Sequence, residues 1–280
     1  LDTGFGSGGK VITPVGSSHD LVYAMALQND GKILVAGYSS NGINDDFAVV
    51  RYNPSGTLDT GFGSGGKVIT PVGSSDDFGR AMALQNDGKI LVAGYSSNGS
   101  NADFAVVRYN PGGTLDTGFG NGGKVITSVG SSADCGRAMA LQNDGKILVA
   151  GHSLGSNYDF AVVRYNPDGM LDTGFGSGGK VITPVGSSDD FGYAMALQND
   201  GKILVAGHII KSHWDFAVVR YNPGGTLDTG FGSGGKVITP VGSSDDKGHA
   251  IVVQNDGKIL VAGYSSNGSN YDFAVIRLWP

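Results

Sequence analysis

A segment of 54 to 57 residues occurs five times in succession and covers the whole 280-residue chain. Each copy contains Leu-Asp-Thr-Gly-Phe-Gly at its start and Gln-Asn-Asp-Gly-Lys-Ile-Leu-Val-Ala-Gly near its middle. The copies begin at Leu1, Leu58, Leu115, Leu171 and Leu227. Near-identical units in tandem are typical of repeat proteins, in which each unit packs on its neighbours. The repeats leave no sequence for a linker, so we expect a single domain over residues 1–280.

Each copy contains four short apolar segments separated by turn residues. In the first copy these are residues 10–15, 23–28, 32–37 and 46–53. Asn29-Asp30-Gly31 separates the second segment from the third and favours a hairpin, which we expect to contain a type I′ turn. Asn53-Pro54-Ser55-Gly56 supplies a further turn. Segments of helical length and period are absent, so the sequence predicts four strands in each repeat.

Four hairpin-linked strands per repeat are typical of a β-propeller, in which each repeat forms one blade. A β-solenoid is the alternative, but its turns are usually shorter than these repeats and lack hairpin-linked strands. We therefore predict an all-β, five-bladed β-propeller with four antiparallel strands in each blade.

The order of the segments suggests how the ring closes. The chain contains segment 10–13 before its first hairpin, and the last repeat ends after segment 272–279 with no further strand. We expect Lys10–Thr13 to pair with Asp272–Leu278, because open strand edges promote aggregation. The alternative is that the same edges pair between molecules, which gives self-assembly into a filament.

Composition argues against several classes of partner. The chain has 19 basic and 25 acidic residues, a net charge of −6 and no cluster of lysine or arginine. This argues against nucleic acid and against anionic membrane surfaces. No apolar run reaches membrane-spanning length, so we expect no membrane insertion. Cys135 is the one cysteine, which excludes an intrachain disulfide. Leu1 lies within the repeat pattern and follows no signal peptide, so we expect a mature product or an excised segment.

The repeated residues resemble the delta-60 repeat family. The family pattern LD..FG..GKV.T......D...A...Q.DGKI..AG......DFA..RY...G.LD matches all five copies. The departures are local: Ser128 stands where the first repeat has Pro14, and Leu278-Trp279-Pro280 replaces Tyr-Asn-Pro. The resemblance implies propeller repeats of bacterial secreted or cell-surface proteins, and it assigns no catalytic residues.

Differences among the copies concentrate in two segments, residues 19–23 and 38–45 of the first copy and their equivalents. In a propeller both segments lie on one face, which we call the variable face. Exposed loops tolerate change without any function, which is the alternative explanation. However, the Leu-Asp-Thr-Gly connection on the opposite face is also a loop and hardly varies. The variable face is therefore the candidate binding face.

Aromatic and amphipathic side chains occur on the variable face more often than a solvated loop requires. Such side chains suit sugar stacking and protein anchoring alike, so we expect a glycan or a surface protein as ligand. The candidate residues are Tyr23, Phe78, Arg80, Tyr193, His208, His213 and Trp214. The histidines come from different blades, so we predict no metal site.

Each repeat also carries an arginine near the end of its last strand segment. Five equivalent charges cannot form one asymmetric catalytic site, so we expect a structural role. We expect each guanidinium to fork onto a carboxylate of a connection, such as Asp59 or Asp30. The arginines are Arg51, Arg108, Arg164, Arg220 and Arg277, and the partner expected for Arg277 is Asp2.

Near-identical blades argue against an enzyme, because an acid, a base and a nucleophile must differ and converge. The Asn-Asp-Gly turn lacks the ligand pattern of a calcium loop, and no cofactor is expected. Five weak equivalent sites gain avidity for a repetitive ligand, as in five-bladed tachylectin-type lectins, which are an architectural analogy alone. We predict a non-catalytic extracellular or cell-surface binding or adhesion module. The alternatives are multivalent glycan binding on the variable face and a structural subunit of a filament or layer.

Overall fold

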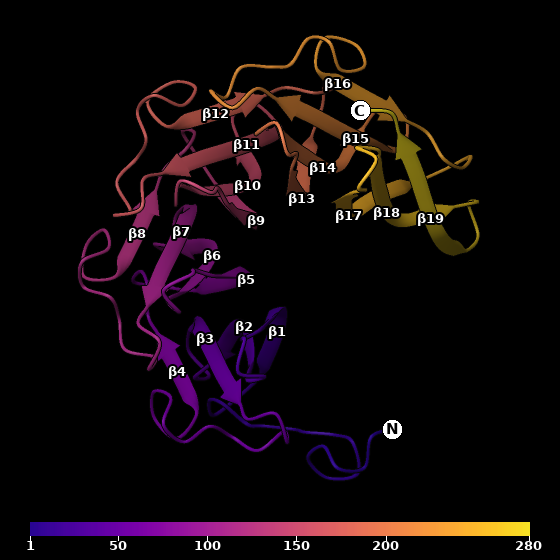
Figure 1. Ribbon diagram of the computed structural model, residues 1–280. Helices are drawn as coiled ribbons and strands as arrows, with labels where there is room; N and C mark the ends of the chain where they lie inside the picture. Colours follow the sequence, from indigo (N-terminus) through magenta and orange to yellow (C-terminus); the bar gives the residue numbers. More distant parts are fainter. The chain divides into compact units, whose positions relative to one another are not determined.

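The computed structural model describes all 280 residues, in two compact units, Leu1–Thr127 and Ser128–Pro280. The expectation of one domain over the whole chain stays a prediction. Every regular element is a strand, and no helix is present that could span a membrane (Figure 1). The prediction of an all-β chain is confirmed.

The unit Leu1–Thr127 contains two four-stranded antiparallel sheets, ordered β1-β2-β3-β4 and β5-β6-β7-β8 (Figure 1). Each sheet follows the chain order: its first three strands come from one repeat, and its fourth strand comes from the beginning of the next repeat. The strands are β1 (Asp20–Leu27), β2 (Ile33–Ser40), β3 (Asp45–Tyr52), β4 (Lys67–Thr70), β5 (Asp77–Leu84), β6 (Ile90–Ser97), β7 (Ala102–Tyr109) and β8 (Lys124–Thr127).

The unit Ser128–Pro280 contains two four-stranded sheets and one sheet of three strands, β17-β18-β19 (Figure 1). Its strands are β9 (Asp134–Leu141), β10 (Ile147–Leu154), β11 (Tyr158–Tyr165), β12 (Lys180–Thr183), β13 (Asp190–Leu197), β14 (Ile203–Ile210), β15 (Trp214–Tyr221), β16 (Lys236–Thr239), β17 (Asp246–Val253), β18 (Ile259–Ser266) and β19 (Tyr271–Leu278). Four antiparallel strands per blade are thus confirmed for four of the five sheets.

The hydrophobic core of each unit lies between consecutive sheets. In Leu1–Thr127, Phe47 and Val49 of β3 belong to one buried cluster with Ile90 and Val92 of β6. Alternate residues of a strand point to opposite faces, so Phe47 and Val49 both face the following sheet. The sheets of Ser128–Pro280 pack in the same way, in one cluster between β10–β11 and β14–β15 and another between β14–β15 and β18–β19.

The Asn-Asp-Gly hairpins form, but their turn type differs from the type I′ expected. Gly31 N donates to Gln28 O at 2.9 Å, and Gln28 N donates to Lys32 O at 2.8 Å. Gly31 has a φ of 82°, whereas no residue other than glycine has a positive φ. The connection is therefore a type I turn followed by a glycine bulge. Three residues instead of two lie between the hydrogen-bonded residues Gln28 and Lys32, and the extra residue accommodates the bulge.

The segment expected to close the ring is not a strand. Residues 11–15 lie outside any strand, and Ile12 is exposed. The equivalent residues of the later repeats form β4, β8, β12 and β16, each paired with the strand before it. Pairing of Lys10–Thr13 with β19 would join the two units, and it stays a prediction.

The repeated arginines contact the connection after their own strand. Arg51 Nε donates to Asp59 Oδ2 at 2.7 Å, and Arg51 Nη1 donates to the carbonyl oxygen of Pro111. Lys32 Nζ lies 3.1 Å from the same oxygen of Asp59. Burial alone would raise the pKa of Asp59, but hydrogen bonds from Lys32 and Arg51 outweigh it and lower that pKa. The guanidinium therefore joins two chain segments rather than forking onto one carboxylate.

The same arginine–aspartate contact recurs in three further repeats, at 2.7 to 2.8 Å. The pairs are Arg108 with Asp116, Arg164 with Asp172, and Arg220 with Asp228. Arg277 and Asp2 belong to different units, and their pairing stays a prediction.

Candidate binding face

A one-residue bulge in the first strand of every sheet sets the geometry of the candidate site. In β1 the register with β2 shifts between Val22 and Ala24, so Tyr23 is the extra residue. A bulge bends its strand and changes the direction in which the extra side chain points. The bulge residues of the other four sheets are Arg80, Arg137, Tyr193 and His249. Every bulge residue is thus aromatic or cationic.

A glycine faces each bulge across the sheet. In β14 a Cβ atom on Gly207 would lie 1.8 Å from the carbonyl oxygen of Phe191, a distance that backbone atoms cannot tolerate. The equivalent glycines in the other sheets would meet the same carbonyl at 1.8 to 1.9 Å. The glycine of Val-Ala-Gly therefore permits the bulge that presents the site residue.

We expect Gly207→Ala to lower the free energy of unfolding by about 3 kcal/mol, because the strands must separate to admit a methyl group. Urea denaturation measures this. Gly224→Ala is the matched control, since its Cβ would meet no atom within 4 Å. Equal stability of the two variants would show that the close approach at Gly207 is relieved at no cost.

In Leu1–Thr127 the Arg80 guanidinium lies among four aromatic rings. Its carbon is 3.9 Å from the ring centroid of Tyr23, 5.5 Å from those of Phe78 and Tyr95, and 5.7 Å from that of Tyr38. Nη2 donates to the Tyr95 hydroxyl at 3.1 Å, while the buried Nε has no hydrogen-bond partner. No carboxylate lies within ion-pair distance of this cation, so ring faces stabilise its charge.

In Ser128–Pro280 the Phe191 ring lies at the centre of a second aromatic cluster. Its centroid is 4.9 Å from that of His152, 5.0 Å from Tyr158 and 5.5 Å from Trp214. The His208 ring is edge-on to Trp214 at 4.7 Å. Phe191, Tyr158 and Trp214 are all half-buried, so this cluster reaches the surface.

A row of stacked rings continues from this cluster. The Tyr193 ring stacks on His208 at 5.0 Å and approaches His249 at 5.2 Å. His249 in turn stacks on Tyr264 at 5.3 Å, and Tyr264 meets the exposed Tyr271 at 5.1 Å. The rings therefore form a continuous surface across three sheets of this unit.

Two cations border the aromatic surface of Ser128–Pro280. Arg137 lies 5.6 Å from the ring centroid of Tyr193, and Lys247 Nζ lies 4.5 Å from that of Trp214. Together with the rings, these groups offer flat apolar faces beside positive charge. Such a surface suits a ligand that combines C–H faces with acidic groups.

Two histidines support this surface from beneath. His152 and His208 are only 3% and 2% exposed. Burial, together with the charge of Arg137, lowers the pKa of His152 to about 3. Burial, with the charges of Lys247 and His249, lowers the pKa of His208 to about 3. Both rings are therefore neutral at neutral pH.

The structure gathers most of the predicted site residues into these two clusters. Tyr23, Phe78 and Arg80 lie together in Leu1–Thr127, and Tyr193 and Trp214 lie together with His208 in Ser128–Pro280. His208 is too buried for direct ligand contact. His213 is exposed on the β14–β15 loop, with Nδ1 3.8 Å from Asp245 Oδ1, and makes no ring contact.

Sequence reasoning missed the ring that follows Val-Ala-Gly in every repeat. Each of these rings contacts neighbouring rings of its cluster. They are Tyr38, Tyr95, His152, His208 and Tyr264, of which His208 alone was among the candidates. The sequence does contain a pattern that predicts these residues, since an aromatic ring follows Val-Ala-Gly in all five copies.

Solved structures with this fold are similar in architecture and distant in sequence. A protein described as an oxidoreductase (glucose dehydrogenase) from Thermus thermophilus matches with a TM-score of 0.51 and 14% identity, over 95% of this chain and 86% of that chain. An arabinanase from Bacillus subtilis matches with a TM-score of 0.48 and 15% identity, over 93% and 95%. A protein of unknown function from Bacteroides caccae matches with a TM-score of 0.47 and 13% identity, over 89% and 72%. Identities this low support the fold alone.

No curated protein matches the chain significantly. The family described as "Domain of unknown function (DUF5122) beta-propeller" matches residues 28–62, 85–119, 142–175, 198–231 and 254–280, one segment in every repeat. These matches confirm the resemblance to a family of tandem propeller repeats and the prediction of a five-bladed propeller fold. The chain belongs to the DUF5122 beta-propeller family.

Proposed function

We propose that the chain is a non-catalytic binding module that takes an acidic glycan on its variable face. The observation that carries this proposal is the chemistry of the bulge residues. All five are aromatic or cationic, and none is a carboxylate. Aromatic faces stack on the C–H faces of sugars, and arginine binds carboxylate or sulfate groups.

Each unit carries a cluster of this kind, one around Arg80 and one around Phe191. Each unit therefore offers a site of its own for such a glycan. The family resemblance supports a secreted or cell-surface location, where adhesion to such polymers would take place.

A glycan array tests the proposal directly. It should contain glycans that bear uronate, sulfate or sialic acid beside neutral glycans of matched length. We expect the acidic members to bind more tightly than their neutral counterparts. Binding to no glycan, or to neutral glycans alone, would contradict the proposal.

The Arg80 charge provides a more specific prediction. We expect Arg80→Gln to weaken binding of an acidic glycan and to reduce the dependence of its affinity on salt concentration, because one charge contact is lost. Affinities measured by calorimetry at low and high salt check this. Lys89→Gln is the matched control: it removes a cation from the same unit but from the Asn-Asp-Gly turn. An unchanged salt dependence in Arg80→Gln would exclude Arg80 from the site.

A structural role in a filament or layer is the second candidate, and one observation supports it. Strand β19 is the outer strand of a three-stranded sheet, and Phe273 on it is fully exposed, whereas Phe160 and Phe216 at the same position of β11 and β15 are buried. An open edge beside exposed apolar side chains favours pairing with a second copy. Electron microscopy at increasing protein concentration would separate filaments from single particles.

A further inference from the structure

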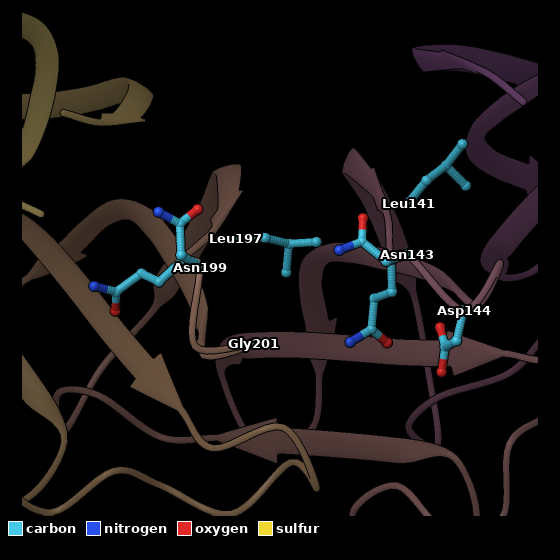
Figure 2. Close-up of a pocket in the computed structure, with 8 residues that line it drawn as sticks. Leu141, Asn143, Asp144, Leu197, Asn199 and Gly201 are labelled. Atoms are coloured by element: carbon cyan, nitrogen blue, oxygen red, sulfur yellow. The ribbon is translucent and has the colours of Figure 1, made fainter. Parts of the chain in front are cut away.

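One pocket recurs at the Asn-Asp-Gly turns, at the opposite end of the strands from the variable face. In Ser128–Pro280 it has a volume of about 450 Å³ and lies between the turns β9–β10 and β13–β14 (Figure 2). Its lining includes Leu141, Gln142 and Asn143 from one turn and Leu197, Gln198 and Asn199 from the next. In Figure 2 the Leu197 side chain extends toward the turn that carries Asn143.

The other unit contains the same pocket independently. In Leu1–Thr127 a pocket of about 430 Å³ lies between the turns β1–β2 and β5–β6. The equivalent residues line it, namely Leu27, Gln28 and Asn29 with Leu84, Gln85 and Asn86. Two units that form the same pocket from the same residues indicate a property of the repeat rather than an irregularity of one loop.

The glutamine side chains of these pockets are not needed by the turn. Backbone groups and the Asp144 side chain close the β9–β10 hairpin: Gln142 N donates to Lys146 O and Gly145 N donates to Gln142 O, both at 2.9 Å, and Lys146 N donates to Asp144 Oδ1 at 3.2 Å. The side-chain Oε1 atoms of Gln142 and Gln198 are nevertheless buried without a hydrogen-bond partner, as are those of the other three copies. A buried carbonyl without a partner costs about 1–3 kcal/mol. The glutamine side chains therefore have no role in closing the hairpin.

The charge of the pocket favours a neutral ligand. Asp144 also lines it, with Oδ2 3.7 Å from Lys146 Nζ. Lys146 is shared with Asp172, which Arg164 also contacts, so two cations balance the two carboxylates. A metal ion would need several uncompensated oxygen ligands, and a lysine ammonium beside the carboxylate opposes one. The remaining polar groups are carboxamides, which both donate and accept hydrogen bonds.

We propose that the pockets between successive Asn-Asp-Gly turns are binding sites for neutral saccharides. Glutamine and asparagine amides match hydroxyl groups, which are likewise both donors and acceptors. The two leucines contact the C–H face of a sugar ring, and the volume lies within the usual range for small-molecule sites. These sites do not depend on the function proposed for the variable face.

Side-chain amide resonances test this proposal on the full chain. The probes are four neutral methyl glycosides: methyl β-glucoside, methyl β-galactoside, methyl α-mannoside and methyl N-acetyl-β-glucosaminide. We expect saturable shifts of the Gln142, Asn143 and Asn199 NH₂ signals, together with those of Gln28, Gln85 and Asn86, for at least one probe. No shift with any of the four probes at their highest soluble concentration would overturn the proposal.

The double variant Gln142→Met/Gln198→Met separates binding from folding. Methionine fills a similar volume and removes the unpartnered carbonyls, so we expect an unchanged or higher melting temperature. Binding in this pocket should weaken at least tenfold, while the pocket around Gln85 keeps its shifts as an internal control. Unweakened binding in the double variant would overturn the proposal. Shifts confined to the Trp214 indole would also overturn it, since the probes would then occupy the variable face.

Discussion

Trp214→Ala combined with Phe78→Ala is expected to weaken binding of an acidic glycan roughly tenfold to hundredfold, the loss usual for a buried aromatic anchor. Trp214 contacts Phe191, His208 and Lys247, and Phe78 contacts the ring cluster around Arg80. Both side chains are half-buried, so folding should persist. Calorimetric titration with the tightest-binding glycan of the array measures the loss, and circular dichroism checks the fold.

Trp279→Ala is the control for this loss. Trp279 is 77% exposed near the end of the chain and lies outside both clusters. The substitution removes the other of the two tryptophans, and the affinity for the glycan should equal that of the parent chain. Equal affinity of Trp214→Ala/Phe78→Ala and the parent would exclude the aromatic clusters as the binding surface.

Acid is expected to destabilise the chain through His152 and His208. Their pKa of about 3 in the folded chain lies below the usual value of 6.5, so the unfolded chain binds protons first as the pH falls. The stability from the neutral rings is complete above pH 6.5 and is lost between about 6.5 and about 3. By pH 5 each histidine should lower the free energy of unfolding by on the order of 2 kcal/mol.

Tyrosine provides a replacement that the chain itself uses. Tyr38, Tyr95 and Tyr264 occupy the position of these histidines in the other repeats. The double variant His152→Tyr/His208→Tyr should therefore lose most of the fall in unfolding free energy between pH 7 and 5. Urea unfolding at both pH values measures the difference. His213→Tyr, at an exposed site, should show the same fall in unfolding free energy between pH 7 and 5 as the parent chain. If the double variant shows that fall too, the buried histidines are not its cause.

The repeat predicted the sheets well because hairpins depend on neighbouring residues. Asn29-Asp30-Gly31 between two apolar segments identified the β1–β2 hairpin, and the five repeats of 54 to 57 residues identified five sheets. The turn type could not be predicted as readily, since it depends on whether two or three residues separate the paired strands. Whether residues 10–13 form a strand could not be predicted from those residues alone either, because a strand forms only where a second strand pairs with its edge.

The candidate site was predicted in part. Variation between copies identified Tyr23, Arg80 and Tyr193, and the structure adds that all three are bulge residues. A bulge depends on the register between two strands, so the sequence of one strand alone does not predict it. The burial of His208 was missed for a similar reason, since rings from the adjacent strands of its own sheet cover it.

The two indole N–H signals offer the most direct test of binding at the variable face. Trp214 lies in the aromatic cluster and Trp279 lies outside it, so each chain carries a reporter and its own reference. During titration with an acidic glycan from the array, we predict that the Trp214 signal shifts and saturates while the Trp279 signal stays in place. A stationary Trp214 signal, or a shift of Trp279 alone, under conditions where the glycan is bound would contradict the account.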